Sequence, residues 1–484
     1  MAGKGQQQRQ QQQPLRILCV SDFFHPNVGG VESHVYELAT NLIALGHTVI
    51  VYTHAYETKD ATYVGRHVLG GPRRPSTQQT KHRGHPPAIT VYYVPRLPVY
   101  QSATLPTIFG SLCNLRKVIR RERIDLVHAH QAFSAMANES IVHARTMGIP
   151  AVFTDHSLFG FADPASILMN KALKFSLADV QRVICVSHTS RENTVLRACV
   201  PPSRVYVIPN AVDMDTFYVD DVARLERNGG RAGLEARDRT VVVMSRLVYR
   251  KGIDLLVRVI PIVCRQFPDV RFVIGGDGPK RDELERMVEA SGLRGRVELA
   301  GLVEKEDVRG FLSQGSIFLN CSLTEAFCVA LVEAAAVGSL VVSTAVGGVP
   351  EVLPEDMMVL AEEASVGGVV KALEKALRMV RDRWHGDTVG ARAERMARQH
   401  ADVVQMYSWR VVATRTERVY YDAIQAARRS TVRQRMARYR LCGKWFGLLC
   451  VALAVVDLML CRVYEWFECV VSVSFSSFVP AGRA

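Results

Sequence analysis

Residues 322–333 read S-L-T-E-A-F-C-V-A-L-V-E, and this stretch gives the strongest indication of the chemistry that we expect of the chain. It follows an apolar run, 317–320, that is typical of a strand. Thr324 occupies the position of a helix N-cap, just before an apolar-periodic segment. On that helix Glu325 and Glu333 would lie roughly 12 Å apart along the axis, on nearly the same side. The free N–H groups of a helix end attract a diphosphate, and the two acids can bind sugar and ribose hydroxyls, so the stretch suits a nucleotide-sugar.

Strand-like runs alternate with helical patterns along residues 15–426, which predicts an α/β fold. The chain opens with a strand at 15–20, a glycine-containing loop, a helix at 31–45 and another strand, which together form a βαβ unit. Further strands are expected at 90–94, 124–130, 151–154, 183–187, 205–208, 240–244, 271–274, 296–300, 317–320 and 340–343.

Three segments are expected to interrupt or extend this alternation. Residues 59–88 hold six Lys or Arg, one acid and two Gly/Pro-rich clusters, which favours a mobile loop or insertion. Residues 102–122 are expected to form one helix. Residues 218–238 are charged, contain Gly229-Gly230 and are expected to form a linker and loop.

Polar residues follow several predicted strands, at the edge where open α/β sheets bind their ligands. His156 comes just after the strand at 151–154. Arg246 and Lys251 lie five residues apart between a strand and a helix, where two cations can converge on a diphosphate. Gly275 opens the turn-rich loop G-G-D-G-P-K, which is not a dinucleotide-binding fingerprint.

Gly29 and Gly30 precede the first helix, where backbone N–H groups can approach a ligand. A Gly-Gly pair is often only a turn, so this assignment stays open on the residues alone.

His128 and His130 are two residues apart on a strand and share a face, which is also a plausible metal-ligand spacing. We find no carboxylate or cysteine partner at a convincing distance along the sequence, so we expect no metal.

The net charge of +13 and the pI near 9.3 favour an anionic partner, such as a membrane surface or a phosphorylated substrate. No nucleic-acid-binding signature accompanies the charge, so we expect no nucleic-acid partner. Eleven cysteines without C-x-x-C pairs indicate reduced thiols in a cytosol-facing domain. The Gln-rich residues 1–13 lack an apolar core, so they are expected to be disordered rather than a secretory signal.

The C-terminal region carries a basic stretch followed by an apolar one. Residues 425–444 hold seven Lys or Arg and no acid, and residues 445–461 hold a single charge, Asp457. Seventeen residues just suffice to span a bilayer, and the flanking basic residues place the preceding chain in the cytosol. Asp457 is costly in lipid, so a neighbouring helix should shield it. An interfacial or buried helix is the alternative.

Four motifs together resemble the signatures of retaining GT-B glycosyltransferases. They are S-D-F-F-H-P-N-V-G-G-V-E-S-H at 21–34, T-D-H-S-L-F-G-F-A-D at 154–163, S-R-L-V-Y-R-K-G-I-D-L-L at 245–256 and T-E-A-F-C-V-A-L-V-E-A-A at 324–335. The resemblance implies the GT-B fold: two Rossmann-like α/β domains facing a cleft, here with a C-terminal transmembrane helix. The expected segments are a polar tail at 1–14, an acceptor-side domain at 15–213, a donor domain with a crossing-back helix at 214–426, a basic linker at 427–444, the transmembrane helix at 445–461 and a short lumenal tail at 462–484.

The last motif is most similar to that of enzymes that transfer N-acetylglucosamine from UDP-N-acetylglucosamine to phosphatidylinositol with retention, the first step of glycosylphosphatidylinositol-anchor synthesis. The resemblance implies that His156 and Glu325 lie at the reaction centre. It implies donor contacts from Gly29, Gly30, Arg246, Lys251, Gly275, Ala326, Phe327, Cys328 and Glu333. It also implies a single-pass protein of the endoplasmic reticulum membrane with a cytosolic catalytic part, other membrane subunits as partners, and no metal or cofactor.

Two other classes remain open on the sequence. One is a different GT-B enzyme, such as a phosphatidylinositol mannosyltransferase or a UDP-sugar epimerase, because the motif residues distinguish donor sugars poorly. The other is a non-catalytic scaffold protein of the same complex, although intact Arg246, Lys251, Glu325 and Glu333 argue against a decayed donor site. The sequence does not identify the residues that bind the acceptor.

Overall fold

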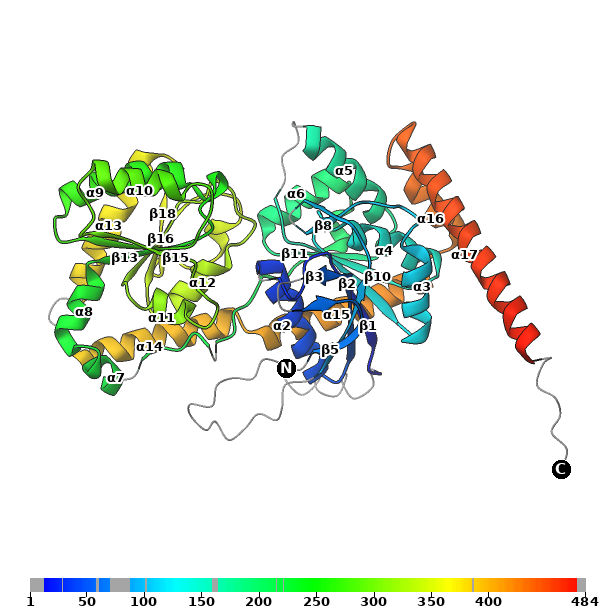
Figure 1. Cartoon of the computed structure of the whole chain (residues 1–484), viewed down its shortest axis with the longest axis horizontal. Helices are drawn as coiled ribbons and strands as arrows, with labels where there is room; N and C mark the ends of the chain where they lie inside the picture. Colours follow the sequence, from blue (N-terminus) through cyan, green and yellow to red (C-terminus); the bar gives the residue numbers. More distant parts are fainter. Residues whose placement is uncertain are drawn as a thin grey trace, which may run out of the picture. The chain divides into compact units, whose positions relative to one another are not determined.

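The computed structural model describes residues 13–476 except 28, 58–60, 70–87, 101, 159–163, 215, 221 and 385–386 (Figure 1). The chain divides into two compact units. Unit 1 holds the residues up to Val186, Arg191–Ile208 and the segment from Ala413 onward, and unit 2 holds Ser187–Ser190 and Pro209–Val412. The predictions for residues 1–12 and for the end of the motif at 154–163 fall outside the described residues, as does most of the expected loop at 59–88.

Unit 1 is built on an eight-stranded sheet in which every strand pair is parallel except β5–β6. The order is β12-β11-β10-β9-β1-β2-β6-β5. The strands are β1 (Arg16–Val20), β2 (Thr48–His54), β5 (Gly65–Leu69), β6 (Ile89–Val94), β9 (Leu126–His130), β10 (Ala151–Asp155), β11 (Arg182–Cys185) and β12 (Val205–Val207). The central strands are buried almost throughout, as expected of parallel strands covered by helices on both faces.

Helices and short hairpins connect these strands. The helices are α2 (Gly30–Ala44), α3 (Leu112–Arg121), α4 (Ala135–Thr146), α5 (Pro164–Leu177), α6 (His188–Ala198) and the single turn η1 (Pro202–Arg204). The hairpins pair β3 (Tyr56–Glu57) with β4 (Thr62–Tyr63), and β7 (Pro98–Tyr100) with β8 (Ala103–Thr104).

Unit 2 is a second doubly wound sheet, of six parallel strands in the order β15-β14-β13-β16-β17-β18. The strands are β13 (Thr240–Met244), β14 (Arg271–Gly275), β15 (Val297–Gly301), β16 (Ile317–Asn320), β17 (Leu340–Thr344) and β18 (Met358–Ala361). The helices are α7 (Val222–Arg227), α8 (Gly230–Asp238), η2 (Tyr249–Lys251), α9 (Ile253–Gln266), α10 (Arg281–Ala290), α11 (Val308–Leu312), α12 (Val329–Ala336), η3 (Val349–Glu351), α13 (Val366–Trp384) and α14 (Val389–Met406).

Each sheet has one point at which the strand order reverses. In unit 1 it lies at β1, which pairs with both β2 and β9, and in unit 2 at β13, which pairs with both β14 and β16. Open α/β sheets bind ligands at this point, outside the carboxyl ends of the strands. The loops that follow β1 and β9, and those that follow β13 and β16, are therefore where the functional side chains should lie.

Three helices close the chain: α15 (Trp409–Arg428), α16 (Val432–Arg440) and α17 (Phe446–Ser476). From Ala413 onward α15 belongs to unit 1, where the buried Tyr420 hydroxyl lies 2.7 Å from Nδ1 of His128 in β9. Within α17, residues Phe446–Glu468 are long and apolar enough to cross a membrane by length and composition.

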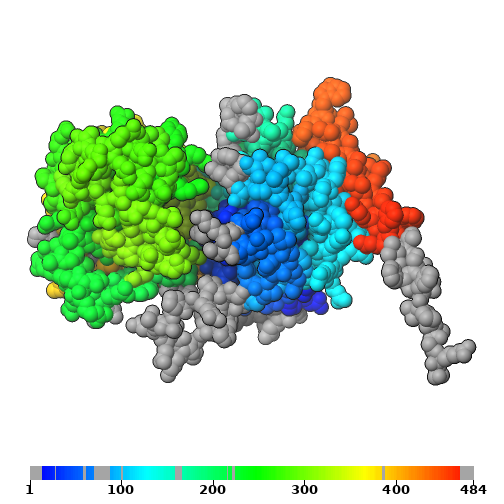
Figure 2. Space-filling model, viewed as in Figure 1, coloured from blue at the N-terminus to red at the C-terminus, as the bar shows by residue number. Residues whose placement is uncertain are grey.

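The α17 helix packs against unit 1 along one face (Figure 2). Within residues 446–468 of this helix, the buried side chains are Cys450, Ala454, Asp457 and Cys461, spaced three or four residues apart. Asp457 is fully buried, and its Oδ1 lies 2.7 Å from Nδ1 of His143 in α4. The helix that we expected to shield Asp457 is thus α4 of the same chain.

Three local predictions are wrong. Residues 102–122 do not form one helix, because Ser102 and Ile108 have φ of 68° and 57°, in the left-handed region, and α3 begins only at Leu112. Residues 218–238 hold α7 and α8, which bury Leu225 and Leu234 against Ala393, and Gly229 with φ of 100° separates the two helices. Within the segment at 59–88, residues 62–69 form β4 and β5 instead of a loop, while the alternative of an insertion stays a prediction.

Candidate functional site

Among the predicted residues of unit 2, Lys251 and Glu325 form an ion pair. Lys251 ends the loop that follows β13, and Glu325 lies in the loop that follows β16, so both lie beside the reversal of strand order. Lys251 Nζ is 2.5 Å from Glu325 Oε1, and both side chains are mostly buried. The sequence therefore identified two partners that lie 74 residues apart in the chain.

Buried hydroxyl and amide groups hold this acid in place. Ser322, which is fully buried, donates from Oγ to Glu325 Oε1 over 2.8 Å, and Thr344 Oγ1 donates to the Ser322 carbonyl over 2.5 Å. Asn320 Nδ2 donates to Ser343 Oγ over 2.9 Å, and Asn320 Oδ1 lies 2.8 Å from Ser322 Oγ. Such a network fixes the rotamer of Glu325, because each partner is itself held.

The prediction that one helix carries both acids is wrong. The α12 helix begins at Val329, and Cys328 before it has φ of 72°, so Thr324 is not its N-cap. Glu325 lies in the preceding loop, where its carbonyl accepts a 2.9 Å hydrogen bond from the Gly348 amide. Only Glu333 is helical. The residues at 322–333 are all compatible with a helix, and the deviation comes from contacts with the loop after β17.

Glycines allow the three loops to pack closely. Gly252 has φ of 70°, and a Cβ there would lie 1.8 Å from the Cys321 carbonyl oxygen. Gly276 has φ of 124°, and a Cβ would lie 1.9 Å from the Ser245 carbonyl oxygen. A Cβ on Gly275 would meet the Phe311 ring at 2.6 Å. The space beside these glycines is thus filled by the protein's own backbone and core, and donor contact at Gly275 stays a prediction.

Arg246 is exposed, and its side chain makes no hydrogen bond or ion pair with any residue that the structure describes. Burial and the nearby charge of Arg246 both act to lower the pKa of Lys251. The Glu325 carboxylate outweighs them, so the net effect is a raised pKa. Lys251 therefore stays protonated at neutral pH, with N–H groups beyond the one that Glu325 accepts. The loop after β13 presents two cations, as a diphosphate site requires.

The remaining predicted residues of unit 2 surround this loop. Ala326 and Phe327 are buried, and the Phe327 ring packs edge-on against Tyr407 with centroids 5.6 Å apart. Cys328 is half-buried, and its thiol pKa is raised by burial and by Glu325 and lowered by Lys251, which places it near that ion pair. Burial raises the pKa of Glu333 to about 7, and Lys305 lowers it.

In unit 1 the loop after β1 is organised by Asp22, which sequence reasoning missed. Its Oδ1 accepts from Thr104 Oγ1 over 2.9 Å, and its Oδ2 accepts from the Ala135 amide over 2.7 Å. Asp22 is fully buried, and burial raises its pKa to about 6 although these hydrogen bonds lower it. The loop leads to Gly29 and Gly30 at the start of α2. Neither glycine has a positive φ, so their ligand contact stays a prediction.

His156 lies just beyond β10, as predicted, within a cluster of imidazoles. His130 Nδ1 is 3.4 Å from His156 Nε2, and the His34 ring meets the His156 ring edge-on with centroids 4.5 Å apart. Burial and the neighbouring His128 lower the pKa of His156 to about 3, so its imidazole is neutral at physiological pH.

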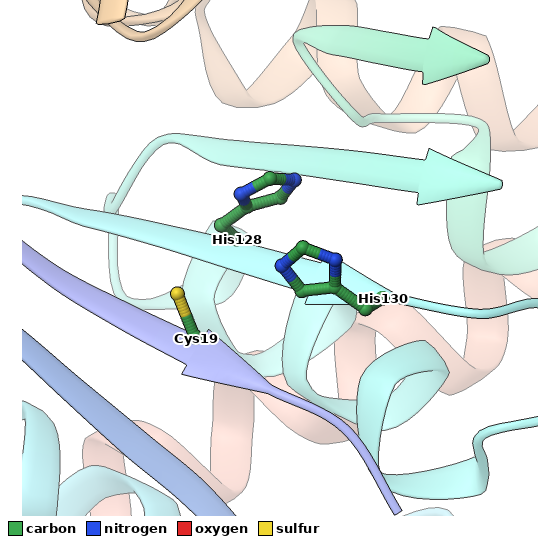
Figure 3. Close-up of side chains that lie close together, drawn as sticks. All are labelled: Cys19, His128 and His130. Atoms are coloured by element: carbon green, nitrogen blue, oxygen red, sulfur yellow. The ribbon is translucent and has the colours of Figure 1, made fainter. Parts of the chain in front are cut away.

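Among the residues that the structure describes, two groups of side chains come close enough to share a metal ion. One is Cys19, His128 and His130, and the other is His34, His130 and His156. Figure 3 shows Cys19 on β1 with His128 and His130 on β9, their side chains on one face of the sheet. The expectation that no cysteine lies near His128 and His130 is wrong. Cys19 is distant from them along the sequence, but the pairing of β1 with β9 brings it beside His128.

These groups are hydrogen-bonded in ways that compete with a metal. His128 Nε2 is 2.7 Å from Thr154 Oγ1 and its Nδ1 is 2.7 Å from the Tyr420 hydroxyl, so both ring nitrogens are used. His130 uses Nδ1 towards His156. A metal on His128 would have to displace these partners, whereas Nε2 of His130 is buried without a hydrogen-bond partner among the described residues. The absence of a metal stays a prediction.

The residues that sequence reasoning missed are supports: Asp22, Asn320, Ser322 and Thr344. Their one signal is position, since each is a small polar residue at or just beyond the end of a buried strand. That signal is common in α/β proteins. What distinguishes these four is their hydrogen bonding: Ser322 donates to Glu325, Asn320 and Thr344 bond to Ser322, and Asp22 ties the loop after β1 to Thr104 and Ala135.

The chain has two doubly wound units, and in one of them a cationic and an acidic residue pair where the strand order reverses. This is the architecture of a glycosyltransferase of the GT-B fold. Comparison with known proteins confirms this predicted fold class. Residues 28–216 match the model of Glycosyltransferase Family 4, and residues 228–385 match that of Glycosyl transferases group 1. Sucrose-phosphate synthase from Thermosynechococcus elongatus superposes with a TM-score of 0.61 at 19% identity, covering 85% of this chain and 100% of its own. HepE from Anabaena, solved in complex with UDP and glucose, gives 0.58 at 18%, covering 84% and 98%.

Curated relatives narrow the class further. A phosphatidylinositol N-acetylglucosaminyltransferase subunit from Arabidopsis thaliana is 48% identical over 94% of this chain and 92% of its own length. The Homo sapiens protein of the same name is 45% identical over 96% and 88%. The chain belongs to this family of phosphatidylinositol N-acetylglucosaminyltransferase subunits, as its motifs predicted.

Proposed function

We propose that this chain transfers N-acetylglucosamine from UDP-N-acetylglucosamine to phosphatidylinositol with retention at the anomeric carbon, the first step of glycosylphosphatidylinositol-anchor synthesis. The relatives' names support the sugar and the lipid acceptor. The single structural observation on which the proposal of an active donor site rests is the Lys251–Glu325 pair, which Ser322 supports. A decayed, non-catalytic protein would have no reason to retain a buried polar network around one acid.

The donor diphosphate would bind to the loop after β13. Arg246 is unpaired within the described residues, and Lys251 has N–H donors to spare, so both can reach phosphate oxygens. The amides at the start of α12 add partial positive charge beside them. As the bond to the sugar breaks, negative charge grows on the departing UDP, and these groups stabilise it. Because two side chains supply the positive charge, we propose that no metal is required.

The transferred sugar would be oriented by polar groups that do not change charge. Glu325 is fixed by Ser322 and Lys251, so its carboxylate can accept hydrogen bonds from sugar hydroxyls while positive charge grows at the anomeric carbon. His156 is neutral and acts as a hydrogen-bond partner, not as a cationic acid. In retention of this kind the departing phosphate is the base that accepts the proton of the inositol hydroxyl.

The membrane context follows from α17 and from the acceptor. A lipid acceptor keeps its headgroup at the bilayer surface, and the candidate span Phe446–Glu468 would hold the catalytic units there. We propose that the protein resides in the endoplasmic reticulum membrane with its catalytic part in the cytosol. The word "subunit" in the names of its relatives supports further membrane proteins as partners.

The test uses microsomes from cells that lack the endogenous enzyme and express this chain together with its partner proteins. Labelled UDP-N-acetylglucosamine and phosphatidylinositol are supplied to the parent, Lys251→Ala and Glu325→Ala. We expect labelled glycolipid from the parent and a loss of about 10²–10³ in rate for either variant, the effect of removing one transition-state contact. Retention is read from the anomeric configuration of the product.

Lys371→Ala and Glu363→Ala are matched controls, because both side chains are exposed in unit 2. They should keep the parental rate at equal protein levels. Equal rates from the parent and the two site variants would refute the donor-site assignment. No glycolipid from any form, with labelled product appearing instead when another sugar donor is offered, would refute the proposed substrate.

A further inference from the structure

A basic pocket lies at the amino-terminal edge of the unit 1 sheet, opposite the edge that carries His156. Arg182 is the first residue of β11, and Arg204 directly precedes β12. These two arginines, with Asp422 and Arg429, line a cavity of about 260 Å³ that Arg438 of α16 completes. The cavity is several times the ~30 Å³ that one water molecule occupies in the liquid, so a ligand group fits in it.

The acids around the pocket are already occupied by other arginines. Asp422 accepts from Arg182 Nε and Nη2 over 2.5 and 2.8 Å. The fully buried Asp179 beneath the pocket is bound by Arg145, Arg435 and Arg438.

The side chains of Arg204 and Arg429 have no hydrogen-bond or ion-pair partner among the residues that the structure describes. Arg204 is half-buried, and its pKa is lowered by burial and by the charges of Arg438 and Arg182, and raised by Asp179. The whole group therefore contains six arginines and two aspartates. A half-buried guanidinium that faces other cations lacks the anion that would normally balance it.

We propose that this pocket binds the phosphate group of an anionic phospholipid. Planar guanidinium groups bind phosphate oxygens in pairs, and Arg204 and Arg429 are free to do so. The membrane supplies the lipid, because α16 contributes Arg438 and is followed, after residues 441–445, by the candidate span. Basic pockets at the point where a chain meets the cytosolic membrane surface bind anionic headgroups. This site is separate from the donor site and needs no sugar transfer.

The experiment uses the full chain in neutral detergent micelles, titrated with short-chain phosphatidic acid or with inorganic phosphate. Phosphatidic acid lacks inositol, so it does not imitate the proposed acceptor. The apparent Kd is read from the rise in the unfolding temperature, which increases when a ligand binds the folded state. We expect phosphatidic acid to bind at least about tenfold more tightly than inorganic phosphate, because its acyl chains remain beside α17 in the micelle.

The site variant is the double substitution Arg204→Gln with Arg429→Gln. The matched control is Arg428→Gln with Arg433→Gln, which removes the same charge from exposed positions of the basic C-terminal stretch outside the pocket. We expect the site variant to weaken phosphatidic acid binding by about tenfold or more, and the control to stay within about twofold. If the site variant is unstable without ligand, Arg204→Lys with Arg429→Lys replaces it, since this pair keeps the charge and loses only the paired geometry.

Three results would overturn the proposal. They are no stabilisation of the parent by either ligand, equal weakening in the site variant and the control, and equal affinity for inorganic phosphate and phosphatidic acid. The second would mean diffuse attraction to the basic stretch, and the third would mean a site for soluble phosphate. Because the readout is a lipid-dependent unfolding temperature, failure here is distinct from failure of the proposed sugar transfer.

Discussion

At the scale of single residues, the carboxyl group of Glu333 titrates close to physiological pH. Burial raises its pKa to about 7, so it is protonated below that value and charged above it. If it accepts hydrogen bonds from the donor ribose, protonation removes an acceptor. We therefore expect the KM for UDP-N-acetylglucosamine to rise as the pH falls from 8 to 6, measured from initial rates in microsomes.

Glu333→Gln is neutral at every pH and should show a flat KM profile near the low-pH value of the parent. Glu363→Gln, an exposed control, should keep the parental slope. A parental slope in Glu333→Gln would assign the titration to another group.

The sequence identified the two paired charges of the candidate site better than the residues that hold them in place. Lys251 and Glu325 were predicted, and the structure pairs them. Ser322 was missed because its role depends on a loop that brings Glu325 back to its hydroxyl. Asp22 was missed because it accepts a hydrogen bond from Ala135, which is distant in the chain. A serine at a strand end has no distinctive local pattern, whereas a lysine in a strand-to-helix loop does.

At the scale of elements, the contact between the loops after β13 and β16 depends on Gly252. Alanine there would place Cβ 1.8 Å from the Cys321 carbonyl oxygen and would hold φ near 70°, which L side chains rarely adopt. We expect Gly252→Ala to separate the two loops, to break the Lys251–Glu325 pair and to lower glycolipid synthesis at least about tenfold. The measurement is the microsomal rate at equal protein levels.

Gly295→Ala is the matched control, because a Cβ at Gly295 has no neighbour within 4 Å and its φ is not positive. It should leave both the rate and the unfolding temperature near the parental values. If Gly252→Ala kept full activity, the packing of these loops would not be needed for catalysis.

A second prediction at this scale concerns the buried pair that joins α17 to α4. His143 Nδ1 is bonded to Asp457, and its Nε2 lies 3.0 Å from Ser111 Oγ. Asp457→Leu leaves the buried imidazole with an unpaired nitrogen, which costs about 1–3 kcal/mol of unfolding free energy. We expect a lower unfolding temperature in detergent for this variant.

The double variant Asp457→Leu with His143→Leu removes both polar partners and should recover much of that loss. Glu465→Leu, an exposed change on α17, is the control for altered helix hydrophobicity. Equal unfolding temperatures for Asp457→Leu and the parent would mean that the pair does not hold the helix.

The start of α17 followed from hydropathy, but its length did not. We expected the apolar helix to end at 461, because Arg462, Glu465 and Glu468 interrupt the apolar run. In the structure the helix continues to Ser476, and Glu468 forms ion pairs with Arg116 and Arg120 of α3. Those partners lie about 350 residues earlier in the chain and cannot be read from the tail.

At the scale of the whole molecule, α17 is part of the packing of unit 1 as well as a candidate anchor. Tyr439, Cys442, Cys450 and Ala454 form a buried cluster with Phe175 of α5. A chain that ends at residue 444 would lose half of this cluster and the partner of His143. We expect faster amide hydrogen exchange in α4 of the truncated protein in detergent, because its outer face loses cover.

The amides of α9 in unit 2 serve as the internal control for that experiment, since α9 makes its contacts within unit 2. Their exchange should not change. Unchanged exchange in both helices would show that α17 can be removed as a simple appendage.

The alternation of strands and helices was enough to predict two α/β domains, because parallel strands and crossover helices have strong local patterns. The division of the chain is subtler. The units change at residues 208–209 and 412–413, and Ser187–Ser190 belong to unit 2. The second change falls inside α15, where Tyr420 and Ala423 are buried on unit 1. The hydrophobic pattern of a helix shows which residues are buried, but only the packed structure shows which unit buries them.

The return of the chain to unit 1 has a consequence for biosynthesis. A ribosome makes the eight strands of the first sheet within about 207 residues, yet the chain returns to this unit only at Ala413, with most of α15 and all of α16 and α17. Until then the hydroxyl that binds His128 does not exist, and the outer face of α4 has no cover. Unit 2, whose segment from 209 to 412 is nearly continuous, can finish folding before the unit that precedes it. The first domain to be synthesised would therefore be the one that needs protection for the longest time.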